Sequence, residues 1–281
     1  MRVVIAQHAG ICYGVERALK LAGEAADDGG AVHTLGPLIH NPQAVRALKE
    51  RGVAVASAVE EVGEGTLVIR SHGVDPAVID RAVDAGLQVI DATCPFVSTA
   101  QRHAADLIRD GYAVVIVGEA EHPEVEGILA HAGGTALIVQ RASDLPERLP
   151  SKRVGVVVQT TQSASRLEEV VSALLGRVNE LRVFNTICSA TAKRQKAAEE
   201  LAGTVDVMVV VGGRNSGNTT RLAEICRSVN SRVHHVETAE ELDPAWFDGA
   251  TVVGVTAGAS TPDEQIRGVI DAIEALGSDD R

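Results

Sequence analysis

The chain has 281 residues, of which 45% are hydrophobic and 23% are charged, and its formal charge is −12. This composition is typical of a globular protein of one or two domains and excludes a disordered chain. The acidic charge and the 2% aromatic content exclude a general nucleic-acid-binding surface. Because no apolar run reaches the roughly 18 residues of a membrane span and the first residues lack a signal-peptide pattern, we expect a cytoplasmic protein that works without a membrane.

The first predicted structural unit begins after an apolar run at residues 3–6 that leads to Cys12. A helix is predicted over 15–25, and the apolar residues 31–35 predict a buried parallel strand. A polar loop with His40 follows this strand. A second helix, a short segment and a strand over 66–69 then lead to the loop Ser71-His72-Gly73. A further helix and an apolar run end at Cys94, which closes the unit.

The same order of elements is predicted twice more along the chain. The third unit stops after its last helix, near Gly277, and lacks a final strand. We therefore expect the amino-terminal run to supply that strand. Helices are predicted over 97–108 and 192–201, and strands over 113–117, 153–158, 205–211 and 251–255.

The repeated order predicts an α/β fold with three pseudo-symmetric lobes and mostly parallel sheets. The expected lobes are residues 13–95, residues 96–190, and residues 191–281 together with 1–12. A spacing of 28 residues separates Cys12 from His40, Cys94 from His122, and Cys188 from Ser216. In parallel sheets, ligands bind beyond the carboxyl ends of the strands, where these loops lie. We therefore expect one central iron–sulfur site between the lobes.

Three cysteines in the same phase of a repeat indicate ligands of a metal centre, because core packing does not require one residue type at three equivalent positions. Cys226 is out of phase, in the middle of a predicted helix, and is expected to be a core residue. The run Lys193-Arg194-Gln195-Lys196 is expected to be a solvated helix face.

Thiolate ligands favour a soft metal, and zinc and iron are both candidates. Structural zinc sites usually contain closely spaced cysteine pairs, which this sequence lacks. One 4Fe–4S cluster fits better, since three cysteines would leave one open iron that can act as a Lewis acid.

Short motifs around these positions resemble one known family. Together with the three in-phase cysteines, they occur in fixed order from Cys12 to Ser260. The motifs are GPLIHN, SHGV, DATCP, HPEVEG, QTT, RNSGNTTRL and GVTAGAS. The sequence is similar to the 4-hydroxy-3-methylbut-2-enyl diphosphate reductases, the terminal enzymes of the non-mevalonate isoprenoid pathway. The resemblance implies reductive dehydroxylation of this allylic diphosphate to isopentenyl and dimethylallyl diphosphates.

The resemblance also implies roles for individual residues. Cys12, Cys94 and Cys188 would hold the cluster. Glu124 would supply protons, with Thr160 beside the substrate hydroxyl and His122 near the diphosphate. Gly217 stands where some relatives have serine, so that a contact there would come from its backbone N–H. The implied substrate-binding residues are His40, His72, His122, Thr160, Thr161, Ser216, Gly217, Asn218 and Ser260.

Three questions stay open at this level. A carboxylate at Glu124 could instead only stabilise a helix amino terminus. Because the sequence lacks a nicotinamide-binding fingerprint, electrons are expected from a small redox protein, a ferredoxin or flavodoxin. A three-lobed iron–sulfur dehydratase similar to quinolinate synthase, or a non-catalytic iron–sulfur or anion sensor, would share many of the same features.

Overall fold

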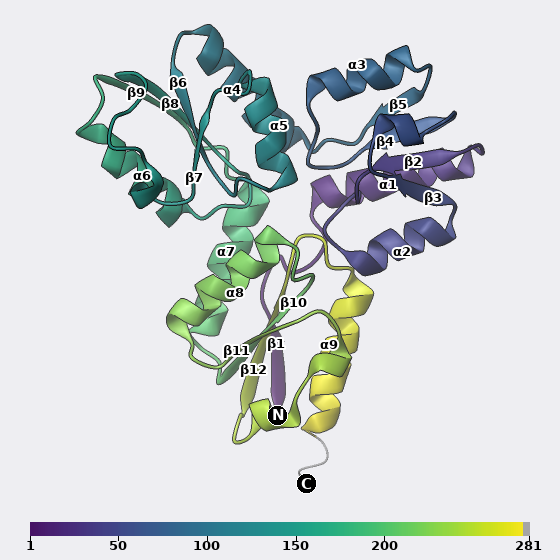
Figure 1. Cartoon of the computed structure of the whole chain (residues 1–281). Coiled ribbons are helices and arrows are strands. Elements are labelled where there is room, and N and C mark those ends of the chain that lie inside the picture. The colour runs from purple at the N-terminus through teal and green to yellow at the C-terminus, as the bar shows by residue number, and fades with distance from the viewer. Residues whose placement is uncertain (278–281) are drawn as a thin grey trace. The chain divides into compact units, whose positions relative to one another are not determined.

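The computed structural model describes residues 1–277, and in this range twelve β-strands alternate with nine α-helices (Figure 1). The strands of this described range form three separate sheets of four strands each, and every strand pair is parallel. This confirms the predicted α/β fold with three parallel-sheet lobes.

The first sheet has the order β3-β2-β4-β5. Its central strand β4 is buried, and Leu67 and Ile69 pack with Ala82 of helix α3 on one face of the sheet. The strands of this sheet are β2 (Val32–Leu35), β3 (Val53–Ala56), β4 (Thr66–Ile69) and β5 (Gln88–Asp91); the helices of this part of the chain are α1 (Tyr13–Asp27), α2 (Pro42–Glu50) and α3 (Pro76–Asp84), with a 3-10 turn at Val59–Glu61.

The second sheet has the equivalent order β7-β6-β8-β9. Helices α4 and α5 cover one face, where Leu107 and Ile128 pack on Ile116, and helix α6 covers the other face (Figure 1). The elements are α4 (Pro95–Arg109), β6 (Ala113–Val117), α5 (Pro123–His131), β7 (Leu137–Val139), a 3-10 turn at Ala142–Asp144, β8 (Arg153–Val158), α6 (Ala164–Leu175) and β9 (Glu180–Phe184).

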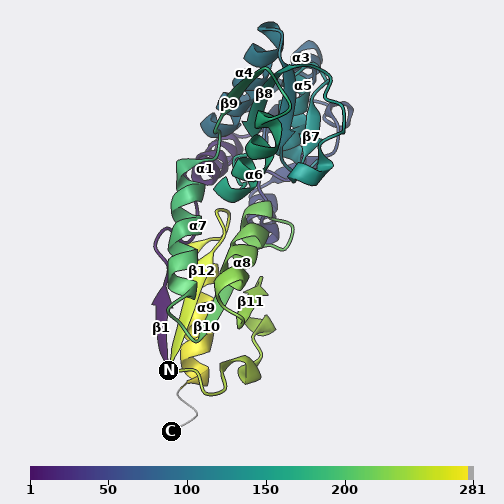
Figure 2. The same ribbon diagram turned by 90° about the vertical axis from the view of Figure 1, so that its left-hand side faces the viewer.

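The third sheet has the order β1-β12-β10-β11, so the amino-terminal strand completes it as predicted. Helices α7 and α8 lie side by side on one face, and α9 covers the other (Figure 2). The elements are β1 (Arg2–Ile5), α7 (Ser189–Ala202), β10 (Val207–Val211), α8 (Gly217–Val229), β11 (Val233–Val236), 3-10 turns at Ala239–Glu241 and Pro244–Phe247, β12 (Val252–Ala257) and α9 (Asp263–Leu276).

The chain forms two compact units by its internal contacts. The first, here called the third-sheet unit, comprises residues 1–15, 40–44 and the described residues from 189 onward. The second, here called the two-sheet unit, comprises residues 16–39 and 45–188 and contains the first two sheets. The lobe boundaries expected from the sequence stay a prediction. No helix in the described range is both long and apolar enough to span a membrane.

The turn before β4 requires glycine at position 65. Gly65 has a φ of +99°, and a Cβ there would lie 2.2 Å from the carbonyl oxygen of Ala31. We expect Gly65→Ala to lower the free energy of unfolding by about 2 to 5 kcal/mol, because left-handed backbone strain and a steric clash add together. Gly86→Ala is the control, since Gly86 has a φ of +79° but no neighbour within 4 Å of such a Cβ. Urea denaturation should show a clearly larger loss at Gly65, and equal losses would contradict the close contact.

Candidate functional site

The three in-phase cysteines occupy equivalent positions in the three sheets. Each follows an edge strand of its sheet, which is β1, β5 or β9, and its amide donates a hydrogen bond to the loop after the neighbouring inner strand, which is β12, β4 or β8. In every case the acceptor is the second residue after that strand ends. The bonds run from Cys12 to the carbonyl oxygen of Ala259 (3.0 Å), from Cys94 to that of Ser71 (2.9 Å) and from Cys188 to that of Thr160 (3.0 Å).

Each of these cysteines is also followed directly by a helix, α1, α4 or α7. A helix amino terminus favours nearby negative charge, which suits an anionic thiolate ligand. None of these three cysteines forms a disulfide within the described residues, and all three are partly exposed. Cys226 differs, because it is fully buried in α8 and burial raises its pKa to about 12. The donor set at Cys12, Cys94 and Cys188 therefore fits a soft metal centre, whereas Cys226 is a core residue, as expected.

Five predicted site residues accompany Cys94 and Cys188 in the two-sheet unit. Glu124, at the start of α5, is 2% exposed and accepts hydrogen bonds from the backbone N–H of Thr160 at 2.6 Å and from its hydroxyl at 2.9 Å. The ring of His72 meets the ring of His122 edge-on, with the two centroids 5.5 Å apart. The hydroxyl of Thr161 accepts a hydrogen bond from Gln159 at 3.1 Å.

Glu124 does not act as the cap of its helix. The capping group is His122, whose Nδ1 accepts a hydrogen bond from the backbone N–H of Glu124 at 3.1 Å. The carboxylate of Glu124 is therefore available to accept the hydrogen bonds from Thr160. Burial raises the pKa of Glu124 to about 7, although the two hydrogen bonds from Thr160 lower it; the charge of Glu119 adds a small upward contribution. A group with this pKa can hold and release a proton near neutral pH.

The remaining predicted residues lie in the third-sheet unit with Cys12. The hydroxyl of Ser260 donates to the carbonyl oxygen of His40 at 3.0 Å. Ser216 caps helix α8, and Gly217 is the first residue of this helix. Both polar atoms of the Asn218 side chain are buried and lack a hydrogen-bond partner among residues 1–277. An unsatisfied buried amide is costly, so this position favours a bound polar ligand.

The predicted residues therefore form two groups, one in each compact unit. The two-sheet unit holds Cys94 and Cys188 with the buried carboxyl group of Glu124, and the third-sheet unit holds Cys12 with Asn218, whose amide has no partner among the described residues. The convergence of both groups on a single central site stays a prediction.

The expectation of a solvated face at residues 193–196 is wrong for Arg194 and Gln195, which are buried. Arg194 donates from Nε to the carbonyl oxygen of His8 at 2.8 Å and from Nη2 to that of Gly10 at 2.7 Å. The buried residues of α7 recur at helical spacing, but most of them are polar or charged, so an apolar periodicity does not mark this face in the sequence. Those residues are Thr191, Arg194, Gln195, Ala198 and Ala202.

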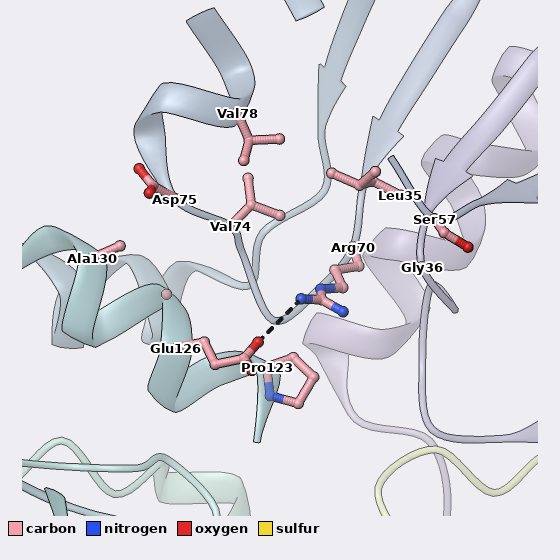
Figure 3. A pocket seen from close by; sticks show the side chains of 11 residues that line it. Leu35, Gly36, Ser57, Arg70, Val74, Asp75, Val78, Pro123, Glu126 and Ala130 are labelled. Carbon is pink, nitrogen blue, oxygen red and sulfur yellow. Dashed lines mark ion pairs between the residues drawn. The ribbon is translucent and has the colours of Figure 1, made fainter. Parts of the chain in front are cut away.

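A cavity of about 340 Å³ lies in the two-sheet unit, beside the segments that contain His72 and His122 (Figure 3). Arg70, the residue before Ser71, reaches into it and lies 3.9 Å from the carboxylate of Glu126. Burial lowers the pKa of Arg70. The ion pair between Arg70 and Glu126 connects the loop that contains His72 to helix α5. A second cavity, of about 310 Å³, lies in the third-sheet unit and is lined in part by Cys12 and Arg194.

Comparison with known proteins identifies similar sequences along the whole chain. The sequence model of the LytB protein family matches residues 3–274. A 4-hydroxy-3-methylbut-2-enyl diphosphate reductase from Geobacter sp. (strain M21) is 54% identical over 281 residues, which cover 99% of each chain. A protein of the same name from Geobacter sulfurreducens is 53% identical over 275 residues, which cover 98% of this chain and 97% of the relative.

Solved structures give the same result. A structure described as (E)-4-hydroxy-3-methyl-but-2-enyl diphosphate reductase, the terminal enzyme of the non-mevalonate pathway, is 48% identical and has a TM-score of 0.72; the match covers 98% of this chain and 100% of that one. The E-1-hydroxy-2-methyl-but-2-enyl-4-diphosphate reductase from Plasmodium falciparum is 24% identical, with a TM-score of 0.92 and coverage of 96% and 87%, and supports the fold alone.

The titration of Glu124 can be measured directly. Because the folded pKa of about 7 lies above the ordinary value of 4.5, the stability that Glu124 contributes is fully present below pH 4.5 and is lost as pH rises through 7. Infrared difference spectra of wild type against Glu124→Gln should show a protonated carboxyl band that disappears around pH 7. Thr160→Val should move this transition to higher pH, since it removes the hydroxyl that donates to the carboxylate. A wild-type band already absent at about pH 5 would contradict the buried, proton-bearing carboxyl.

Proposed function

Because this chain belongs to the LytB protein family, we propose that it catalyses the reaction for which its relatives are named, the reduction of 4-hydroxy-3-methylbut-2-enyl diphosphate. It is an oxidoreductase of the non-mevalonate isoprenoid pathway. Overall, the substrate takes up two electrons and two protons, the allylic C–O bond breaks, and the hydroxyl leaves as water. The products are isopentenyl and dimethylallyl diphosphates. The observation that carries the proposal is the equivalent placement of Cys12, Cys94 and Cys188 together with a buried acid of pKa about 7.

The family implies an iron–sulfur cluster. We propose that it is one 4Fe–4S cluster held by Cys12, Cys94 and Cys188, so that one iron is open. The partly exposed cysteines directly before three helix amino termini support this ligand set. When bound, such a cluster supplies electrons and a Lewis-acidic iron.

Glu124 is the proposed proton donor. Its carboxyl group is buried and half-protonated near pH 7, and its hydrogen-bond partner is the hydroxyl of Thr160. A protonated Glu124 can donate to the Thr160 oxygen, and this hydroxyl can pass its own proton to the substrate. His122 fixes the backbone at Glu124 and belongs to the same catalytic set. Because the carboxyl group is shielded from water, the proton is held for the substrate and does not exchange freely with solvent.

The diphosphate is proposed to bind through neutral or titratable donors. Asn218 offers a buried amide to which no other described residue is bound, and Gly217 offers a backbone N–H at the amino terminus of α8, where anions are favoured. The other proposed contacts are His40, His72, His122, Thr160, Thr161, Ser216 and Ser260. Electrons are proposed to come from a ferredoxin or flavodoxin, which the missing nicotinamide fingerprint in the sequence supports.

Cluster content tests the ligand set. Anaerobically purified wild type should contain about four irons per chain with matching sulfide. Each of Cys12→Ser, Cys94→Ser and Cys188→Ser should lose most of this iron. Cys226→Ser is the control and should keep it, because this side chain is buried in the core. Bound zinc in place of iron and sulfide, or full iron content in Cys94→Ser, would refute the proposed centre.

Turnover tests the reaction and its acid. Wild type with a chemical reductant should convert 4-hydroxy-3-methylbut-2-enyl diphosphate to the two products in a single-turnover assay. Glu124→Gln should keep its cluster and bind substrate but react about 100- to 10,000-fold more slowly, because it lacks the general acid. Glu126→Gln is the matched control on the same helix, and its exposed side chain predicts a rate within a few-fold of wild type. A wild type that holds a cluster but converts no substrate would favour the sensor alternative.

A further inference from the structure

The loops before Cys12 and Cys94 are each held by an arginine from a helix that directly follows another in-phase cysteine. Arg194 belongs to α7, which begins after Cys188, and donates two hydrogen bonds to the loop before Cys12. Arg17 belongs to α1, which begins after Cys12. It donates from Nη1 to the carbonyl oxygen of Thr93, in the loop before Cys94, and from Nη2 to that of Asp91, the last residue of β5, both at 3.2 Å. An arginine that binds the backbone before a cysteine thus occurs once in each compact unit.

The loop before Cys12 has an irregular backbone, and Arg194 binds it at two carbonyl groups. Residues 6–12 contain no helix or strand, and His8 has a φ of 64°, in the left-handed region that non-glycine residues rarely adopt. Backbone bonds tie the loop at its two ends, from Ala6 to Val255 at 2.8 Å and from Cys12 to Ala259 at 3.0 Å. Between these ends, the carbonyl groups of His8 and Gly10 are bound by Arg194.

The burial of Arg194 shows that this contact is specific. The residue is only 3% exposed, and a buried guanidinium is costly unless its N–H groups find acceptors. Charge-assisted hydrogen bonds are stronger than neutral ones, so the arginine and the loop fix one another. The segment before Cys188 is held differently. There the hydroxyl oxygen of Thr186 accepts from the backbone N–H of Val158 at 3.0 Å, a neutral contact within one sheet.

We propose that Arg194 and Arg17 are positioning residues for the iron–sulfur cluster, each of which fixes the loop that presents one cysteine ligand. The proposal rests on the ligation by Cys12 and Cys94 proposed above. A ligand held in place before the metal binds loses less freedom on binding, and the groups that orient ligands therefore raise the affinity of the site. Each arginine lies on the helix that follows one cysteine and binds the backbone that precedes another. The helix after Cys188 thus fixes the loop of Cys12, and the helix after Cys12 fixes the loop of Cys94.

Iron release from the holoenzyme tests this proposal. Wild type, Arg194→Met and Arg17→Met are purified anaerobically, and the loss of iron to a ferrous-iron chelator is followed with time. We expect both variants to release iron at least about tenfold faster, because each loses charge-assisted hydrogen bonds to a ligand loop. Arg194→Lys, which keeps the charge and can still reach one carbonyl group, should be intermediate. The electron paramagnetic resonance spectrum of the reduced cluster should also change in Arg194→Met.

Arg232→Met is the matched control in the third-sheet unit. Arg232 also donates from Nη2 to two backbone carbonyl groups, those of Trp246 at 2.7 Å and Asp248 at 3.0 Å, but in a segment that precedes no cysteine. It should lose thermal stability and still release iron within twofold of wild type, with an unchanged spectrum.

The outcomes separate this proposal from the proposed function. Release rates and spectra of Arg194→Met and Arg17→Met that match wild type would overturn the positioning role and leave the cluster intact. A wild type without iron and sulfide would overturn both. If Arg194→Met does not fold, Arg17→Met decides alone, because its side chain is only partly buried and its removal opens a smaller void.

Discussion

The parallel pairing of β4 with β5, of β8 with β9 and of β12 with β1 is the constraint on which the candidate site depends. In the first sheet Asp91 of β5 lies opposite Ile69 of β4, and in the third sheet Ile5 of β1 lies opposite Val255 of β12. Parallel strands end at the same edge, so the two loops that leave them run side by side. The amide of each in-phase cysteine can then bond the neighbouring loop, which fixes the cysteine backbone three times in the same way.

Thr160 contacts both a proposed cluster ligand and the proposed proton donor. Its carbonyl oxygen accepts from the amide of Cys188, while its own N–H and hydroxyl donate to the carboxylate of Glu124. The proposed cluster ligand and the proposed acid are therefore held by the same short segment. Burial opposes the charge of Glu124 and the bonds from Thr160 favour it, and the balance brings the pKa near 7. A proton donor for a reaction at neutral pH needs this balance.

Polar groups are buried in this protein where they have a positional task. Arg194 is buried against backbone carbonyl groups of the loop before Cys12, and Asn218 is buried without a partner in the described part of the chain. Both are unfavourable for folding in isolation, since each takes polar atoms out of water. The proposed roles differ accordingly: Arg194 finds its partners within the chain and orders a loop, whereas Asn218 finds its partner in the diphosphate of the substrate.

The sequence alone determined the element order, the amino-terminal strand of the third sheet and the positions of the three in-phase cysteines. These features follow from the local periodicity of apolar residues and from a residue spacing that recurs three times. Only the tertiary structure decided that Arg194 is buried, that His122 caps α5 and leaves the Glu124 carboxylate to bind Thr160, and that Asn218 lacks a partner within residues 1–277. The sequence pattern does not distinguish a charged or polar residue on a solvent-exposed helix face from one on a packed helix face. Its burial and its partners depend on which helix face meets distant parts of the chain, and this information is not local.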